Sequence, residues 1–356
     1  MANPAQPNSQ AVMIAGMHRS GTSLTASILQ QAGVFIGDQL LGAAASNPKG
    51  HFEDRDFLTL HIDILTALGL SSEGWLTVGQ LAVPEQLWPR AQALCDRRQQ
   101  AHDLWGWKEP RTTLLLNFWK QLLPEAKVVL PYRAPWEVLD SLFTRSDPAF
   151  INNPNFAVEV WLTYNRAVLE FYQQYPDDCF LFHCDVLKTH EAGFIEQLRH
   201  KLQVPLSVPD QPLFDPAVMH KQINDTHRPT LLARHFPETL EVYAALQQAA
   251  DLPTPQNWEA TLATDVDEAV YRAWVLEDWR AYNYCQTEKR QLKAEIQQLK
   301  VEMQQQRERC DAEVQQIQVC LDNAHETIRV MEANRAWQLR NAWLSLKNAL
   351  TGSATE

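Results

Sequence analysis

The chain has 356 residues, of which 45% are hydrophobic and 21% are charged, so it can bury the core of one large domain and still carry an extension. Its formal net charge is -12. No basic run offsets this charge, which argues against a nucleic-acid partner, although a few clustered cations can still bind a small anion.

Cysteine spacing and hydrophobicity along the chain bear on its compartment. The six cysteines form no C-x-x-C pair and match no zinc spacing, which predicts reduced thiols, a cytoplasmic protein and no bound metal. The first ten residues lack the positive start of a signal peptide. No apolar window of about 18 residues occurs, so no transmembrane helix is predicted.

Residues 1–10 are polar and predict a disordered leader. Beyond them, short apolar runs predict four strands, at 11–17, 104–108, 127–132 and 179–183. Amphipathic segments between them predict helices, chiefly at 24–33, 57–70, 84–102, 112–123, 136–145 and 156–175. Strands that alternate with helices indicate the α/β class, and we expect a three-layer, P-loop-like fold with a central parallel sheet.

The composition changes after about Glu288, where Gly and Pro vanish until Gly352. Apolar residues then follow steps of four and three from Leu292 to Met331, with one extra step of four that resembles a stutter. This spacing predicts a coiled coil, and hence a homo-oligomer. The alternative, a lone solvated helix, would leave its apolar stripe wet. We therefore expect a leader at 1–10, a catalytic domain at 11–284, the coiled coil at 285–335 and a tail at 336–356.

The tail is amphipathic and contains Trp337, Trp343 and Leu350. Such a segment can cap the coil, contact a partner or lie peripherally on a membrane surface.

The first predicted strand runs into Gly16-Met17-His18-Arg19-Ser20-Gly21-Thr22-Ser23. This segment keeps the glycine spacing of a Walker A motif, but Thr22 replaces the lysine and the cation has moved to Arg19. Backbone N–H groups and a helix N-terminus still suit an anion that is bound without a metal. The alternative is a strand–turn–helix that needs its glycines only for packing.

The segment resembles the 5′-phosphosulfate loop of sulfotransferases that use 3′-phosphoadenosine-5′-phosphosulfate (PAPS). It is similar to the H-R-S-G-T-S form of bacterial members and to the P-R-S-G-T-T form of the tyrosylprotein branch. The resemblance implies a donor-binding loop made of His18, Arg19, Ser20, Gly21, Thr22 and Ser23.

A second similarity follows the third predicted strand. Sulfotransferases place an Arg at a strand end and a Ser eight residues later, and both bind the 3′-phosphate of the donor. Arg133 and Ser141 have this spacing, and Arg145 lies one turn further on, where it can add charge. An Arg fork suits a phosphate because it can donate two parallel hydrogen bonds. The alternative for Arg133 is a surface ion pair.

Two shorter segments extend the resemblance. Lys108-Glu109-Pro110-Arg111 is similar to the K-D-P-R of bacterial members, which implies that Lys108 points at the sulfuryl group and that Arg111 serves the acceptor or the phosphate. The segment around Asp185 weakly resembles Y-E-D-L, and we assign Asp185 no chemical role. The closing motif over the adenine is absent, and residues 214–234 are a substitute on position alone.

Transfer to a hydroxyl also needs a base. The loop at Gly50-His51-Phe52-Glu53 offers two, and Glu53 is preferred because the branches with the most similar phosphate loop use Glu; His51 is the alternative. The proposed acceptor is a saccharide, since coiled coils with aromatic tails also occur on bacterial enzymes that build surface glycans.

Two other functions compete with this one. A P-loop kinase or NTPase needs a lysine before Thr22 and an acid at a strand end for Mg²⁺, and the sequence offers neither by our strand assignment. A non-catalytic coiled-coil scaffold predicts loss of the cationic motifs, yet Arg19, Lys108 and Arg133 are present.

Overall fold

A computed structural model describes residues 9–42, 50–145, 147–209, 227–262 and 266–351. The chain divides into two units, residues 1–265 and residues 266–356. Most of the predicted leader and most of segment 214–234 lie outside the described residues, so both stay predictions.

The N-terminal unit is built on a four-stranded sheet in which every pairing is parallel, with the strand order β2-β1-β3-β4. All four predicted strands are confirmed. Only the first differs, because it ends at Ile14 and leaves residues 15–21 to form a turn. The strands are β1 (Gln10–Ile14), β2 (Leu104–Lys108), β3 (Lys127–Tyr132) and β4 (Cys179–His183).

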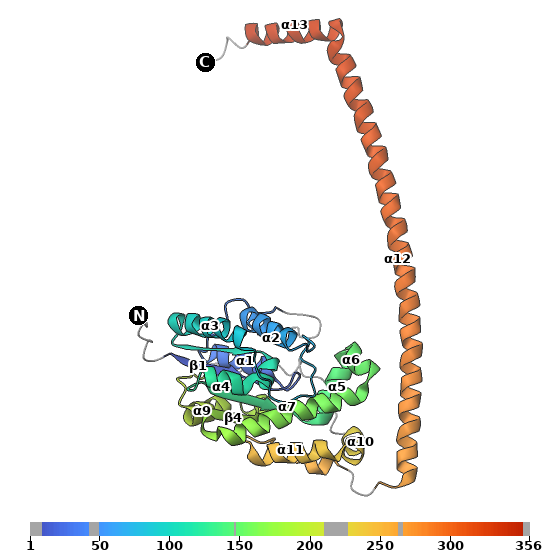
Figure 1. Cartoon of the computed structure of the whole chain (residues 1–356). Helices are drawn as coiled ribbons and strands as arrows, with labels where there is room; N and C mark the ends of the chain where they lie inside the picture. The colour runs from blue at the N-terminus through green and yellow to red at the C-terminus, as the bar shows by residue number, and fades with distance from the viewer. Residues whose placement is uncertain (1–8, 43–49, 146, 210–226, 263–265, 352–356) are drawn as a thin grey trace. The chain divides into compact units, whose positions relative to one another are not determined.

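Alternate strand residues face two separate hydrophobic cores, which makes the unit a three-layer α/β fold as predicted (Figure 1). On β1, Met13 faces one core and Ile14 the other. The first core is closed by α2 (Arg55–Ala67), α3 (Trp88–Ala101), α4 (Leu116–Leu122), α5 (Pro135–Arg145), α6 (Pro148–Asn152), α7 (Pro154–Gln174), α10 (Arg228–His235) and α11 (Pro237–Ala249). The second is closed by α1 (Thr22–Gln31), α8 (Val186–Thr189) and α9 (Glu191–Leu202).

The helix predicted at 112–123 is two elements. Residues Pro110–Leu115 form a 3-10 helix, and α4 continues from Leu116. The proline starts the turn with a fixed φ, and the six residues of this 3-10 helix are all buried. In the part of the chain that the structure describes, further short 3-10 turns lie at Glu85–Leu87, Pro176–Asp178 and Trp258–Thr261.

Pro131 lies in β3, a central strand, although proline cannot donate a ladder hydrogen bond. The pairing of β3 with β1 stops at Val129, whose carbonyl accepts from the Ala15 amide at 3.1 Å. On the other side, Pro131 is in register with Phe182. The missing N–H of Pro131 therefore lies on the β1 side of the strand, beyond the last residue of β3 that pairs with β1.

The C-terminal unit consists of α12 (Glu268–Ala333) and α13 (Arg335–Thr351). The helical extension is thus observed, but it starts at Glu268, where the Asp267 side chain caps it, rather than near residue 285. Within α12 no residue is buried. Among the described residues, no helix has the length and hydrophobicity needed to cross a membrane. Contact of α13 with a membrane or partner stays a prediction.

Candidate active site

The carboxyl ends of three neighbouring strands carry the residues that the sequence singled out. The turn 15–21 follows β1, Lys108 ends β2, and Arg133 follows β3. Ile14 is in register with Lys108, which places the two strand ends side by side. The chain leaves β1 toward β2 and later enters β3 on the opposite side, so this edge is the switch point where open α/β sheets bind ligands.

The turn after β1 depends on two glycines. Gly21 has φ 86°, and a Cβ there would lie 2.8 Å from the Cβ of Cys184. At Gly16, a Cβ would lie 2.6 Å from the carbonyl oxygen of Pro131. Both positions therefore exclude larger side chains, and the turn packs tightly against the ends of β3 and β4.

The turn also holds buried polar atoms that lack a partner. Ser20 Oγ and His18 Nε2 are shielded from solvent and make no hydrogen bond among the described residues. The His18 ring lies 4.4 Å from the Trp75 ring, centroid to centroid. Burial and the nearby Arg111 hold the pKa of His18 well below its usual range, so the ring is neutral. Unpaired buried donors are costly, and an anion at the start of α1 would satisfy them.

Cations gather beside the turn. Arg19 Nε donates to Ser141 Oγ at 2.8 Å, and Arg133 Nη1 approaches the Arg19 carbonyl at 3.4 Å. The structure therefore brings the turn after β1 together with the Arg133/Ser141 pair, since the bonded residues Arg19 and Ser141 are 122 positions apart. Burial lowers the pKa of Arg19, and the positive charges of Arg133 and Arg145 lower it further. Such crowding of like charge would be relieved by a bound polyanion.

Arg133 also pairs with Glu137, one turn into α5, at 2.8 Å between Nε and Oε2. Both side chains are largely buried, so Arg133 is not the surface ion pair that the sequence left open. Arg133 lies two residues before α5, and its spacing of four from Glu137 is a signal that our sequence analysis missed.

The assignment of Arg133 to a 3′-phosphate site stays a prediction, and it gives an expected result: Arg133→Ala should weaken PAPS binding by about 1.5–3 kcal/mol, the range for hydrogen bonds to charged groups. Arg133→Lys keeps the charge opposite Glu137 but loses the planar fork, so it should recover only part of the affinity. Isothermal titration calorimetry measures both, with the exposed Arg97→Ala as control. Unchanged affinity in Arg133→Ala would remove Arg133 from the donor site.

Lys108 and Glu53 form a buried ion pair at the same edge. Lys108 Nζ lies 2.7 Å from Glu53 Oε1, and the side chains are 2% and 11% exposed. Backbone pairing of Glu53 with Lys108 holds the two residues together. Burial lowers the pKa of Lys108, while the Glu53 carboxylate opposes this shift. The structure thus joins the preferred base to the expected sulfuryl-binding cation.

His51 lies close to both groups. Its carbonyl accepts a hydrogen bond from Ser23 Oγ at 3.1 Å, which ties this loop to the start of α1. Burial lowers the pKa of His51, although the nearby Glu53 raises it. A neutral imidazole can accept a proton, so His51 keeps the chemistry of the alternative base.

Glu109 comes directly after β2, so our expectation that no strand ends beside an acid was wrong. Trp119 Nε1 donates to His61 Nε2 at 3.0 Å, and His61 Nδ1 therefore donates to Glu109. Arg111 pairs with the other Glu109 oxygen. Burial alone would raise the pKa of Glu109, but Arg111 and His61 hold it at about 2. These contacts occupy both oxygens, which favours a structural role over Mg²⁺ binding.

Arg111 is used in the same internal network. Its Nε donates to the Ser72 carbonyl at 2.9 Å, and a Cβ on Gly74 would lie 2.8 Å from its Cγ. Its part in acceptor or phosphate binding stays a prediction. The His61–Glu109–Trp119 network was missed, although a histidine between Leu60 and Ile64 on an apolar helix face was a signal for it.

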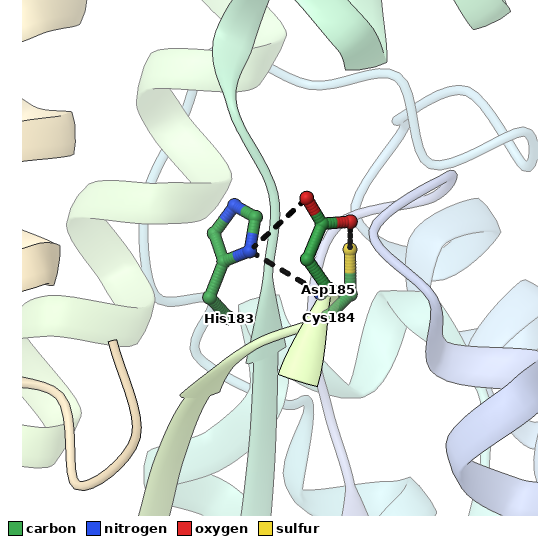
Figure 2. A group of neighbouring side chains, drawn as sticks. All are labelled: His183, Cys184 and Asp185. Carbon is green, nitrogen blue, oxygen red and sulfur yellow. Dashed lines mark hydrogen bonds and ion pairs between the residues drawn. The ribbon is translucent and has the colours of Figure 1, made fainter. Parts of the chain in front are cut away.

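His183, Cys184 and Asp185 follow one another at the end of β4, with potential ligand atoms within 4.8 Å of each other (Figure 2). His183 Nδ1 accepts from the Asp185 amide at 3.2 Å, and Asp185 pairs with Lys188. Burial lowers the pKa of His183 to about 4 and raises the pKa of the Cys184 thiol. The Nδ1 atom of His183 and the carboxylate of Asp185 are therefore already engaged in contacts within the chain.

Comparisons with known proteins give only distant similarities. No family model and no curated protein matches the chain. A sulfotransferase domain from the curacin biosynthetic pathway aligns over 69% of this chain and 99% of its own, at 16% identity and a TM-score of 0.41. A sulfotransferase domain from a Synechococcus olefin synthase covers 70% and 98% at 19% identity and TM-score 0.39. The Mycobacterium tuberculosis sulfotransferase STF1 covers 57% and 69% at 13% identity and TM-score 0.35.

Proposed function

We propose that the N-terminal unit transfers a sulfuryl group from PAPS to a hydroxyl acceptor. The observation that carries the proposal is one sheet edge that combines a lysine-free anion turn with the buried Lys108–Glu53 pair. An NTPase would neutralise its phosphates with a P-loop lysine and Mg²⁺. Here Arg19, Arg133 and Arg145 supply positive charge at and close to the turn.

Each group has a distinct task in this proposal. The turn from His18 to Ser23 binds the 5′-phosphosulfate, and Arg133 with Ser141 binds the 3′-phosphate. Lys108 stabilises charge that develops on the sulfuryl and bridging oxygens. Glu53 takes the acceptor proton, and its second carboxylate oxygen can do so while Oε1 stays paired with Lys108.

The acceptor is proposed to be a saccharide, and the protein is proposed to be bacterial and cytoplasmic. Incubation with labelled PAPS and separate pools of envelope glycan, peptide and lipid tests this choice. Label in the glycan pool supports a saccharide acceptor. Label confined to another pool overturns that part and leaves sulfuryl transfer intact.

Adenosine 3′,5′-bisphosphate without metal should raise the melting temperature of the protein. At about 100 times the dissociation constant, ligand binding stabilises a fold by about 2.7 kcal/mol, or about 5–10 °C for a unit of this size. Mg·ATP should do much less. Differential scanning fluorimetry measures the shift, and Arg19→Gln, which removes a cation beside the turn, should reduce it. An equal or larger shift with Mg·ATP would contradict the proposal.

A further inference from the structure

The helix α12 carries glutamates that have no basic residue at ion-pair spacing within the helix, although Glu302 accepts a hydrogen bond from Gln298. Glu288, Glu295 and Glu302 recur every seven residues. On a helix, charges pair with residues three or four positions away. For these three glutamates, none of those positions holds Lys or Arg. Basic residues instead lie five positions further on, where a side chain of the same helix faces elsewhere: Lys293, Lys300 and Arg307.

These charges flank the apolar seam. Leu292 and Leu299 occupy d positions of the heptad, and Ile296 and Met303 occupy a positions. All four side chains are at least half exposed, between 52% and 69%. In this register the three glutamates fall at g and the three basic residues at e. These two positions set partner choice and orientation in coiled coils.

We propose that α12 forms a parallel, in-register coiled coil with a second copy of this chain. In that arrangement each g residue faces the e residue five positions further along the other helix, so every glutamate meets Lys or Arg. Charges are complementary on both sides of the seam, because each helix carries glutamates at g and basic residues at e. An antiparallel pair would place g against g and e against e, which opposes glutamate to glutamate.

The apolar residues of the seam also favour a coiled coil of two helices in this orientation. Ile at a with Leu at d favours parallel dimers over larger bundles, and the first heptads follow that rule at Ile296, Leu292 and Leu299. Further along the seam, the g and e positions form no further pair of opposite charge. The pairs of opposite charge are therefore confined to three heptads, and these heptads determine the relative orientation of the two helices. The proposal stands apart from the chemistry of the N-terminal unit.

Charge reversal on the full chain tests the pairing. E288K/E295K/E302K places lysine against Lys or Arg and should weaken dimerisation at least about tenfold in analytical ultracentrifugation. Adding K293E/K300E/R307E restores every pair in swapped form, keeps the net charge of the natural chain, and should restore the dimer. Two lysines on the outer face that lie neither three nor four residues from any of the three glutamates, A294K/V301K, should have little effect. A monomeric natural chain, or failure of the swap to restore association, would overturn the proposal.

Native cysteines test the orientation. Cys285 lies at a d position, one heptad before Leu292, whereas Cys320 lies at g. In a parallel in-register dimer two Cys285 thiols face each other within disulfide reach. Mild oxidation should therefore crosslink C310S/C320S, which keeps Cys285, and should crosslink C285S/C310S much less. Cys95, Cys179 and Cys184 are buried and should not interfere. Dimers that do not crosslink through Cys285 would show another orientation and overturn the proposal.

Discussion

Glu53→Gln is expected to lower kcat by about 10²–10⁴-fold while it leaves PAPS affinity nearly unchanged. The glutamine amide keeps the size of the side chain, and its oxygen can still accept from Lys108 Nζ, which lies 2.7 Å from the present carboxylate. It cannot take a proton from the acceptor. Steady-state kinetics and calorimetry on the same variant separate turnover from donor binding.

Two variants make this result specific. Asp56→Asn changes a nearby, more exposed carboxylate at the start of α2 and should leave kcat unchanged. His51→Ala removes the alternative base. If His51→Ala loses turnover and Glu53→Gln keeps it, the base is His51 and the assignment of Glu53 is wrong.

The pH profile of Glu53→Gln gives a second readout. Lys108 must stay charged to stabilise developing negative charge, and burial lowers its pKa while Glu53 raises it. Removal of the Glu53 carboxylate takes away the largest contribution that opposes burial and leaves only that of Glu109, so the pKa of Lys108 falls further. The alkaline limb of the residual activity should therefore move to lower pH.

Lys108→Ala should also lower kcat, by about 10²–10³-fold, because it removes charge stabilisation in the transition state. It will also reduce stability, since the buried Glu53 loses its cation. Lys120→Ala is the matched control. Lys120 is another buried lysine, with Nζ 2.8 Å from Asp178, and it lies near the amino ends of β3 and β4, whereas Lys108 lies at the carboxyl edge of the sheet. It should reduce the melting temperature and leave kcat unchanged. Comparable loss of kcat in both variants would show that Lys108 acts only through stability.

The sheet could be predicted because each strand is buried on both faces and appears as an unbroken apolar run, such as KVVLPY at 127–132. The turn after β1 could be predicted because its glycine spacing and donors are local in sequence. Joining Arg19 to Ser141 required the resemblance to a family, since no local signal connects residues 122 positions apart.

The contacts inside the site could not be predicted in the same way. The pairing of Lys108 with Glu53 depends on how the loop after α1 returns to the end of β2, and no periodicity encodes that return. Glu109 looked like a small variation on an aspartate, yet its extra length is used to contact His61 and Arg111 together. The start of α12 at Glu268 was missed although its signal is local, since the Asp267 cap was readable from the sequence.

The end of the β1–β3 ladder is determined by the backbone as much as by side chains. After the bond from the Ala15 amide to Val129, a parallel ladder would continue with a bond from an amide at position 131 to the Ala15 carbonyl. Pro131 has no such hydrogen, so the ladder ends at that point, although Gly16 stays close to the Pro131 carbonyl. A sequence change there from proline to valine would be apolar and conservative in volume, yet it would permit one more hydrogen bond between the turn 15–21 and β3. Variation at position 131 should therefore be weighed with the charged residues when other chains are judged for the same activity.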